Sequence, residues 1–216
     1  IDPKALAWGE INDWQAVFDG AKKFGQIPIY RIARDLGVRN QPDLTLSNMG
    51  RALNVLTKGK VLGEELKIAA IFIDYIQAIP FDEEFPSKHK YDRRLQVRDD
   101  IFRLRDMSAA YDCPVIVGVQ AKQALTGDLG PNMLIPGQYD GEDSAAIAQR
   151  VDRIISLWMP KTTHTIGKEL SHRGYYYTVN EEMMWVRVVK QREYGLPSGR
   201  SWHCEWDYEN YSISVV

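Results

Sequence analysis

The stretch Lys67-Ile68-Ala69-Ala70-Ile71-Phe72-Ile73-Asp74-Tyr75-Ile76-Gln77 decides the fold of this chain. Its apolar part is short and rich in β-branched residues, which is typical of a strand buried on both faces of a parallel sheet. The run ends at Asp74, and a carboxylate at the carboxyl end of such a strand faces the crevice where open α/β sheets bind ligands. Such an Asp either caps the next turn or holds a phosphate-bound metal ion. The residues alone leave both roles open.

The composition is that of one soluble domain. With 216 residues, 44% of them hydrophobic, the chain can bury a sizeable core. The net charge of −2 gives no overall basic signature, so any nucleic-acid contact would come from a local patch or from backbone amides. Cys113 and Cys204 make no metal-ligand spacing with the histidines, which predicts a reducing, intracellular setting. No apolar run is long enough to span a membrane, so we expect a soluble, cytoplasmic protein with no membrane partner.

The first two thirds of the chain alternate between helix and strand patterns. Apolar spacing predicts helices over Asp13–Phe24, from near Ser47 to Gly59, and over Arg93–Tyr111. Short apolar runs predict strands at Ile27–Ile32 and at Val115–Val119, the second of which ends in Gln120. The order strand, helix, strand implies a right-handed crossover and a parallel pair.

The last third changes character. A long loop rich in Gly, Pro, Asn and Asp, residues 127–143, leads to a short helix at Ser144–Arg150 and a third strand at Ile154–Trp158. After Pro160 the pattern predicts an antiparallel β extension. Its expected strands are Tyr175–Val179 and Met184–Val189, joined by Asn180-Glu181-Glu182, and a half-buried strand in which Trp202, Cys204 and Trp206 alternate.

Four segments, in order along the chain, resemble motifs of the DnaB-type replicative helicases. Asp74-Tyr75-Ile76-Gln77 resembles the Asp-Tyr-Leu-Gln form of the family's second helicase motif, and Val119-Gln120-Ala121-Lys122-Gln123 stands where the family has Ser-Gln-Leu-Asn-Arg. The resemblance implies that Asp74 holds the magnesium ion of bound ATP. It also implies that Gln120 senses the terminal phosphate, a role for which an amide is suited because it donates or accepts without a proton change.

The third segment, Asp140 to Asp152, resembles the family's Asp-Leu-Arg-Glu-Ser-Gly loop and the Ile-Glu-Gln-x-Ala-Asp helix after it. The resemblance implies that this loop holds single-stranded DNA, largely through main-chain amides. The residues concerned are Asp140, Gly141, Glu142, Asp143, Ser144 and Ala145. Glu142 stands where the family has its Arg, so a direct phosphate contact is lost and part of the DNA contact would move to Lys122 or to the basic patch Lys88–Arg94. A solvated loop is the alternative for that patch.

The fourth segment is Lys190-Gln191-Arg192, followed by Tyr194, Gly195, Pro197 and Gly199. It resembles the family's Lys-Gln-Arg-Asn-Gly-Pro-Thr-Gly motif. The resemblance implies that Lys190 and Arg192 act on the ATP of a neighbouring subunit, where a cation supplied in trans stabilises charge on the transferred phosphoryl group.

One part of an ATPase motor is absent from the sequence. A P-loop requires Gly-x-x-x-x-Gly-Lys-Ser/Thr, and the nearest dipeptide, Gly59-Lys60, is followed by Val61 and has Asn54 in place of the first Gly. In the family the P-loop, its strand and the catalytic glutamate all precede the region that matches Ile11. We therefore expect residues 1–216 to form a single, N-terminally incomplete motor domain that does not hydrolyse ATP alone, and whose sheet lacks an internal strand.

These expectations define a fold and a function. The fold is α/β, a RecA-like P-loop NTPase fold with a mainly parallel central sheet flanked by helices, a C-terminal antiparallel extension and no P-loop strand. The function is an ATP-dependent replicative helicase motor of a bacterial or phage-infected cell, using ATP and Mg²⁺ and working as a hexameric ring on single-stranded DNA. Primase and a helicase loader are partners that the resemblance allows. The alternatives are a RecA- or KaiC-like ATPase, and a degenerate, non-catalytic DNA-binding or ring-assembly module.

Overall fold

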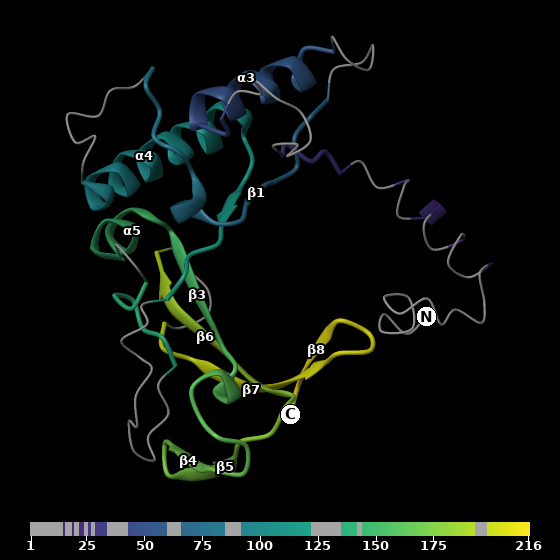
Figure 1. Cartoon of the computed structure of the whole chain (residues 1–216), viewed down its shortest axis with the longest axis vertical. Helices are drawn as coiled ribbons and strands as arrows, with labels where there is room; N and C mark the ends of the chain where they lie inside the picture. Colours follow the sequence, from purple (N-terminus) through teal and green to yellow (C-terminus); the bar gives the residue numbers. More distant parts are fainter. Residues whose placement is uncertain are drawn as a thin grey trace.

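The computed structural model describes residues 29–33, 43–59, 66–84, 92–121, 135–141, 144–192 and 198–216, together with isolated positions between residues 15 and 26. The protein is mixed α/β. Figure 1 shows helices packed around a two-stranded parallel sheet at one end and antiparallel strands at the other. In the described part of the chain, no helix combines the length and the apolar character that crossing a membrane requires.

The parallel end is built from α3 (Leu46–Thr57), β1 (Ile71–Ile73), the 3-10 turn η1 (Ile76–Ala78), α4 (Arg93–Tyr111) and β2 (Val115–Val117). β1 and β2 pair in parallel with Phe72 opposite Ile116. α4 has the predicted bounds and begins at Asp92, whose side chain accepts from the amides of Arg94 and Leu95. Its apolar residues join a core of seven buried side chains: Leu46, Ile76, Ile79, Val97, Ile101, Leu104 and Ile147.

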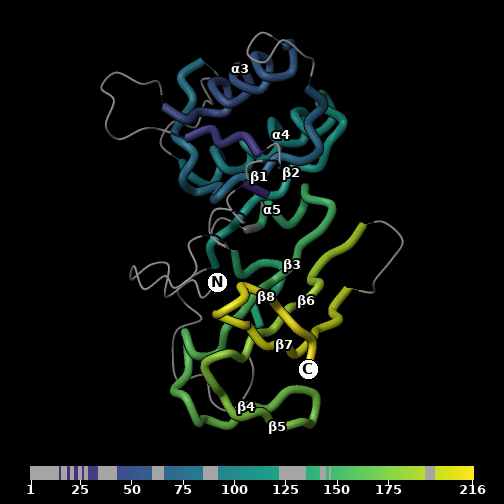
Figure 2. Tube along the Cα trace, turned by 90° about the vertical axis from the view of Figure 1, so that its right-hand side faces the viewer, coloured from purple at the N-terminus to yellow at the C-terminus, as the bar shows by residue number. Residues whose placement is uncertain are grey.

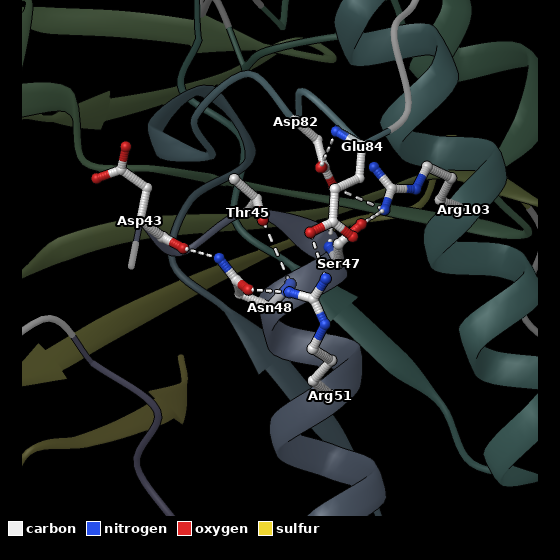
Figure 3. A network of polar contacts seen from close by, with 8 residues as sticks. All are labelled: Asp43, Thr45, Ser47, Asn48, Arg51, Asp82, Glu84 and Arg103. Carbon is white, nitrogen blue, oxygen red and sulfur yellow. Dashed lines mark hydrogen bonds and ion pairs between the residues drawn. The ribbon is translucent and has the colours of Figure 1, made fainter. Parts of the chain in front are cut away.

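A polar network fixes the start of α3 against α4 and against the chain that follows η1 (Figure 3). Thr45 caps the helix, because its hydroxyl accepts from the amide of Asn48 at 3.3 Å. The buried Asp82 accepts from the amide of Ser47 at 2.9 Å and pairs with Arg103 at 2.8 Å. Burial alone would raise the pKa of Asp82, but the hydrogen bonds from Ser47 and the bond and charge of Arg103 hold that pKa below its ordinary value. Arg103 also donates to the Ser47 hydroxyl, so one carboxylate joins three segments.

The antiparallel end contains a four-stranded sheet in the order β3-β6-β7-β8. The strands are β3 (Arg153–Trp158), β6 (Met183–Gln191), β7 (Ser201–Asp207) and β8 (Ser212–Val215). A separate hairpin, β4 (Glu169–His172) with β5 (Tyr175–Thr178), packs against this sheet through Leu170 and Tyr177. The buried core between them consists of Ile135, Trp158, Leu170, Val179, Met183 and Trp185. Between the two ends lies α5 (Ser144–Arg150), which packs on α4 through Ile147 (Figure 2).

Three expectations about the strands are wrong. Within the described residues the strands do not form a mainly parallel sheet, because β1 and β2 alone pair in parallel there and β3 pairs antiparallel with β6. β1 and β2 are not buried on both faces, since Phe72 is 74% exposed and Ile116 is 48% exposed. β5 does not continue into a hairpin with β6. It pairs instead with β4, because Arg173 and Gly174 adopt positive φ angles and form a two-residue turn of the kind that joins adjacent strands.

The N-terminal expectations are mostly beyond what the structure describes. The helix predicted over Asp13–Phe24 lies outside the described residues except at isolated positions. Of the strand predicted at Ile27–Ile32, residues 29–32 are described, and they are exposed and pair with none of the described strands. An exposed segment without a partner strand cannot keep β structure, because its backbone ladder is unfilled.

Candidate functional site

The carboxyl ends of β1 and β2 meet at one corner that contains Asp74. The amide of Gly118 donates to Ile73 at 2.8 Å, and the Gly118 carbonyl accepts from the amide of Ile76 at 3.0 Å, so the two chains stay paired beyond their last strand residues. A Cβ at Gly118 would lie 3.4 Å from Asp74 Oδ1. Gly118 therefore lies directly beside the Asp74 carboxylate. Asp74 itself is exposed, and its peptide bond to Tyr75 is cis.

Gln120 belongs to the same corner. Its backbone amide donates to the side-chain oxygen of Gln77 at 3.4 Å, so the last residue of the Asp74–Gln77 segment contacts the strand end that carries Gln120. The Gln120 side chain is exposed. The structure thus places the predicted metal-binding Asp and the predicted phosphate-sensing Gln at the same edge of the parallel pair.

Arg93 holds the turn after Asp74 and was not identified from the sequence. From the first turn of α4 its guanidinium donates to the carbonyls of Ile76 and Ile79, both at 3.1 Å. Ile76 is fully buried and Ile79 nearly so, which leaves their carbonyls with little access to water. A signal was available in the sequence, because a cation opens the helix at Arg93, where the helix dipole disfavours positive charge.

The segment at Gly141 connects this corner with the predicted DNA loop. Ala121, directly after Gln120, forms an isolated antiparallel bridge with Gly141. Asp140 is engaged within its own turn, where its carboxylate accepts from the amide of Gly137 at 2.6 Å. Ala145 is exposed in α5, and the backbone of Ser144 begins that helix. Glu142, Asp143 and Lys122 lie outside the described residues.

Lys190 and Arg192 both bind the C-terminal end of α5 in their own chain. Lys190 Nζ donates to the carbonyls of Ala148 at 2.5 Å and Val151 at 2.9 Å. Arg192 donates to the carbonyl of Gln149 and pairs with Asp152 at 3.3 Å. Burial, and then the charge of Arg192, lowers the pKa of Lys190 below its ordinary value, although Asp152 opposes the shift. The two predicted trans-acting cations therefore have structural partners within the chain.

The corner offers a magnesium ion one carboxylate, which suits the ion only if the phosphates of a nucleotide supply further ligands. The described residues contain no cluster of three or more His, Cys, Asp or Glu side chains that could hold a metal ion by themselves. Magnesium commonly uses one or two carboxylates, several waters and the substrate's phosphates, so a single exposed carboxylate such as Asp74 is a sufficient protein ligand of that kind. The residue that would hold the ion is therefore Asp74.

A second polar cluster lies beneath the β4–β5 hairpin, and the sequence did not predict it. The rings of His172, Tyr177 and His203 surround Trp185, with centroids 5.1, 5.0 and 5.2 Å from that of Trp185. Buried nitrogen or hydroxyl atoms of His172, Trp185, Arg187, Ser201 and His203 have no hydrogen-bond partner among the residues that the structure describes. The alternation of strand residues predicts inward-facing side chains, but the partner of each ring depends on the β4–β5 pairing, which the sequence did not reveal.

Neither a scan against protein-family models nor a search of curated proteins finds a match to this chain.

Proposed function

We propose that this chain is part of the motor domain of an ATP-driven DNA helicase of the DnaB type, with a RecA-like fold. One observation carries the proposal. The carboxyl ends of two parallel strands bring Asp74 beside Gly118 and join the Asp74–Gln77 segment to Gln120. Ligands of open α/β sheets bind at this edge, and a carboxylate and an amide there suit a metal-bound nucleotide phosphate.

The proposal assigns a role to each residue of the corner. Asp74 would hold a magnesium ion or its water, and the ion would supply positive charge to the phosphates of ATP. Gln120 would hydrogen-bond the terminal phosphate and register its loss. The backbone amide of Gln120 donates to the side chain of Gln77, and the next residue, Ala121, forms a β-bridge with Gly141. A change at Gln120 would therefore reach the loop assigned to single-stranded DNA, residues 140–145.

Exposed apolar side chains support an additional strand between β2 and β3. Phe72 and Ile116 are exposed on the parallel pair, and on β3 Ile155 is 61% exposed and Leu157 is 57% exposed. Among the described residues, β2 pairs only with β1 and β3 only with β6. Parallel sheets are normally covered on both faces, so bare apolar residues beside two unpaired edges are expected where a strand and its covering helix fit. A P-loop strand would occupy this position.

The test is phosphate release by two proteins. The 216-residue chain is expected to release no phosphate from ATP above a buffer control, because its sequence has no P-loop to bind the phosphates. The protein expressed from its complete open reading frame is expected to hydrolyse ATP, with activity lost in Asp74→Ala and strongly reduced in Gln120→Ala. Hydrolysis by the isolated chain that Asp74→Ala abolishes would contradict the first expectation. Full activity of both variants in the complete protein would overturn the role of the corner.

A second candidate, a non-catalytic DNA-binding or ring-assembly module, is favoured by a different observation. Lys190 and Arg192 are already engaged by α5, so they have a role that requires no ATP. This candidate predicts DNA binding or self-association that does not change with added nucleotide or with Asp74→Asn. A RecA- or KaiC-like ATPase would share the corner and hydrolyse ATP but would not separate DNA strands.

A further inference from the structure

The β4–β5 hairpin is a fixed element that nevertheless exposes two aromatic rings. Tyr175 is 70% exposed and Tyr176 is 73% exposed. Neighbouring strand residues point to opposite faces, so Tyr176 lies on the outer face and Tyr175 on the face of Tyr177, but beyond the buried core. The hairpin thus carries one large exposed ring on each face, and exposed aromatic rings are typical of a binding site rather than of the core.

Several contacts hold the hairpin in place. Leu170 and Val179 are completely or almost completely buried, and the ring of Tyr177 packs edge-on against Trp185 and His203. At the tip, Arg173 donates to the carbonyl of Gly199 at 2.9 Å, which ties the hairpin to the connection between β6 and β7. A ligand that stacks on Tyr175 and Tyr176 would therefore not have to order the hairpin first.

The local charge indicates the kind of partner. Between Pro160 and Thr178 the cations are Lys161, Lys168 and Arg173, and Glu169 is the single carboxylate, whereas the whole chain has a net charge of −2. Exposed aromatic rings among cations suit single-stranded nucleic acid, because bases stack on the rings and phosphates are attracted to the cations. An acidic protein surface would use only the cations, and a purely apolar surface would use only the rings.

The position of the hairpin agrees with this chemistry. Ile135 packs in the same core as Leu170 and Val179, and the hydroxyl of Ser156 donates to the carbonyl of Pro136 at 2.6 Å. Residues 135–141, the segment that leads into the proposed DNA loop, therefore pack against the same buried core as the hairpin. In Figures 1 and 2 the hairpin forms the end of the molecule farthest from α3.

We propose that the β4–β5 hairpin binds single-stranded nucleic acid, with bases stacked on Tyr175 and Tyr176 and a phosphate near Arg173. The inference rests on the proposed function only in naming a second contact for the same strand. The chemistry of the hairpin does not depend on the ATP corner, so the two proposals can fail separately.

The experiment is fluorescence anisotropy of a labelled 30-nucleotide oligo-dT titrated with the full 216-residue chain at low salt. Tyr175→Thr and Tyr176→Thr remove a ring but keep strand propensity, and each is expected to weaken binding about tenfold. Tyr175→Phe and Tyr176→Phe keep the ring and should bind as the unmodified chain does. Arg173→Asn creates an Asn-Gly turn, which favours the hairpin turn although the contact with Gly199 is lost, and it should lower the salt dependence of binding. Unchanged tryptophan fluorescence and an unchanged melting temperature would verify that each variant keeps the fold.

Two further variants separate the outcomes. Tyr211→Asn removes an equally exposed ring (65%) from the β7–β8 turn and should leave binding unchanged. Ala145→Pro removes an amide from the first turn of α5, where proline is tolerated. Loss of binding in the Tyr→Thr variants but not in Ala145→Pro would support the hairpin and count against the loop. The reverse result would overturn the hairpin proposal, as would no binding of the oligonucleotide by the unmodified chain, or a loss in Tyr211→Asn equal to that in the hairpin variants.

Discussion

At the scale of single residues, the clearest contacts are those that Lys190 and Arg192 make with α5. The last carbonyls of a helix have no partner within the helix and carry partial negative charge, so cations stabilise them. α5 has only seven residues, and a helix this short depends on such contacts. The resemblance implied a role in trans for both residues, while the structure gives them a role within the chain, and neither role excludes the other.

Replacing Lys190 tests the structural role directly. Lys190→Met keeps the length of the side chain and removes the charged donor to Ala148 and Val151. We expect the free energy of unfolding to fall by about 1–2 kcal/mol, the range for hydrogen bonds from a charged group at a partly exposed site. Urea unfolding followed by tryptophan fluorescence measures the change. Lys67→Met, at an exposed position, is the control, and equal stability of the two variants would show that α5 does not need Lys190.

The burial of Asp100 makes the free energy of unfolding depend on pH. It is 4% exposed, and its Oδ2 has no hydrogen-bond partner within the described part of the chain. Burial raises its pKa from 3.8 to about 6, although the charges of Arg93 and Arg103 oppose the shift. Because the folded protein binds this proton more tightly than the unfolded chain does, the contribution of Asp100 to the free energy of unfolding is present below pH 3.8 and is lost as the pH rises through about 6.

Asp100→Asn mimics the protonated side chain at every pH. We therefore expect this variant to be more stable than the unmodified chain at pH 7.5, by about 1–3 kcal/mol. The gain should disappear near pH 4. Chemical unfolding at both values measures it, with the exposed Asp106→Asn as the control. A variant less stable at pH 7.5 would show that the carboxylate is charged and stabilised by the nearby arginines.

At the scale of elements, local pattern predicted α4 well and the hairpin badly. Val97, Ile101 and Leu104 recur at helical spacing and are the apolar residues that α4 buries. For β5 the strand was predicted correctly, but its partner was not, because pairing depends on β4, whose Ser171 and His172 give no apolar signal. The Arg173-Gly174 turn was the available signal, since glycine commonly allows positive φ in two-residue hairpin turns.

The hairpin should loosen in acid. Burial lowers the pKa of His172, helped by the charges of Arg173 and Arg187, and burial also lowers the pKa of His203, against the effect of Glu205. The folded protein therefore binds these protons less readily than the unfolded chain. The stability that the two neutral rings contribute is present near neutral pH and is lost as the pH falls below their ordinary value of 6.5.

His203→Phe isolates this effect. A phenyl ring can still stack on Trp185, and it cannot gain a proton. We expect the melting temperature of the variant to fall less between pH 7 and pH 5 than that of the unmodified chain. Because Asp100 contributes with the opposite sign over this interval, the comparison is made in the Asp100→Asn background. Parallel pH profiles of the two proteins would show that His203 does not titrate beneath the hairpin.

At the scale of the whole molecule, α5 and the Ala121–Gly141 bridge join the parallel end to the antiparallel end. Apolar side chains are exposed on β1, β2 and β3, and within the described part of the chain β2 and β3 each pair with one strand. Sequence patterns predicted most of the helices and strands and placed Asp74 and Gln120 at neighbouring strand ends. They did not predict that β3 joins an antiparallel sheet, because strand direction is set by long-range pairing that no local pattern encodes.

The most direct measurement of the central claim is unwinding of a forked DNA duplex by the protein expressed from its complete open reading frame. The account predicts strand separation that requires ATP and magnesium and is lost in Asp74→Asn, while that variant still binds single-stranded DNA. Hydrolysis of ATP without unwinding would favour a RecA- or KaiC-like ATPase. Unwinding that persists in Asp74→Asn, or DNA binding with neither hydrolysis nor unwinding, would contradict the account.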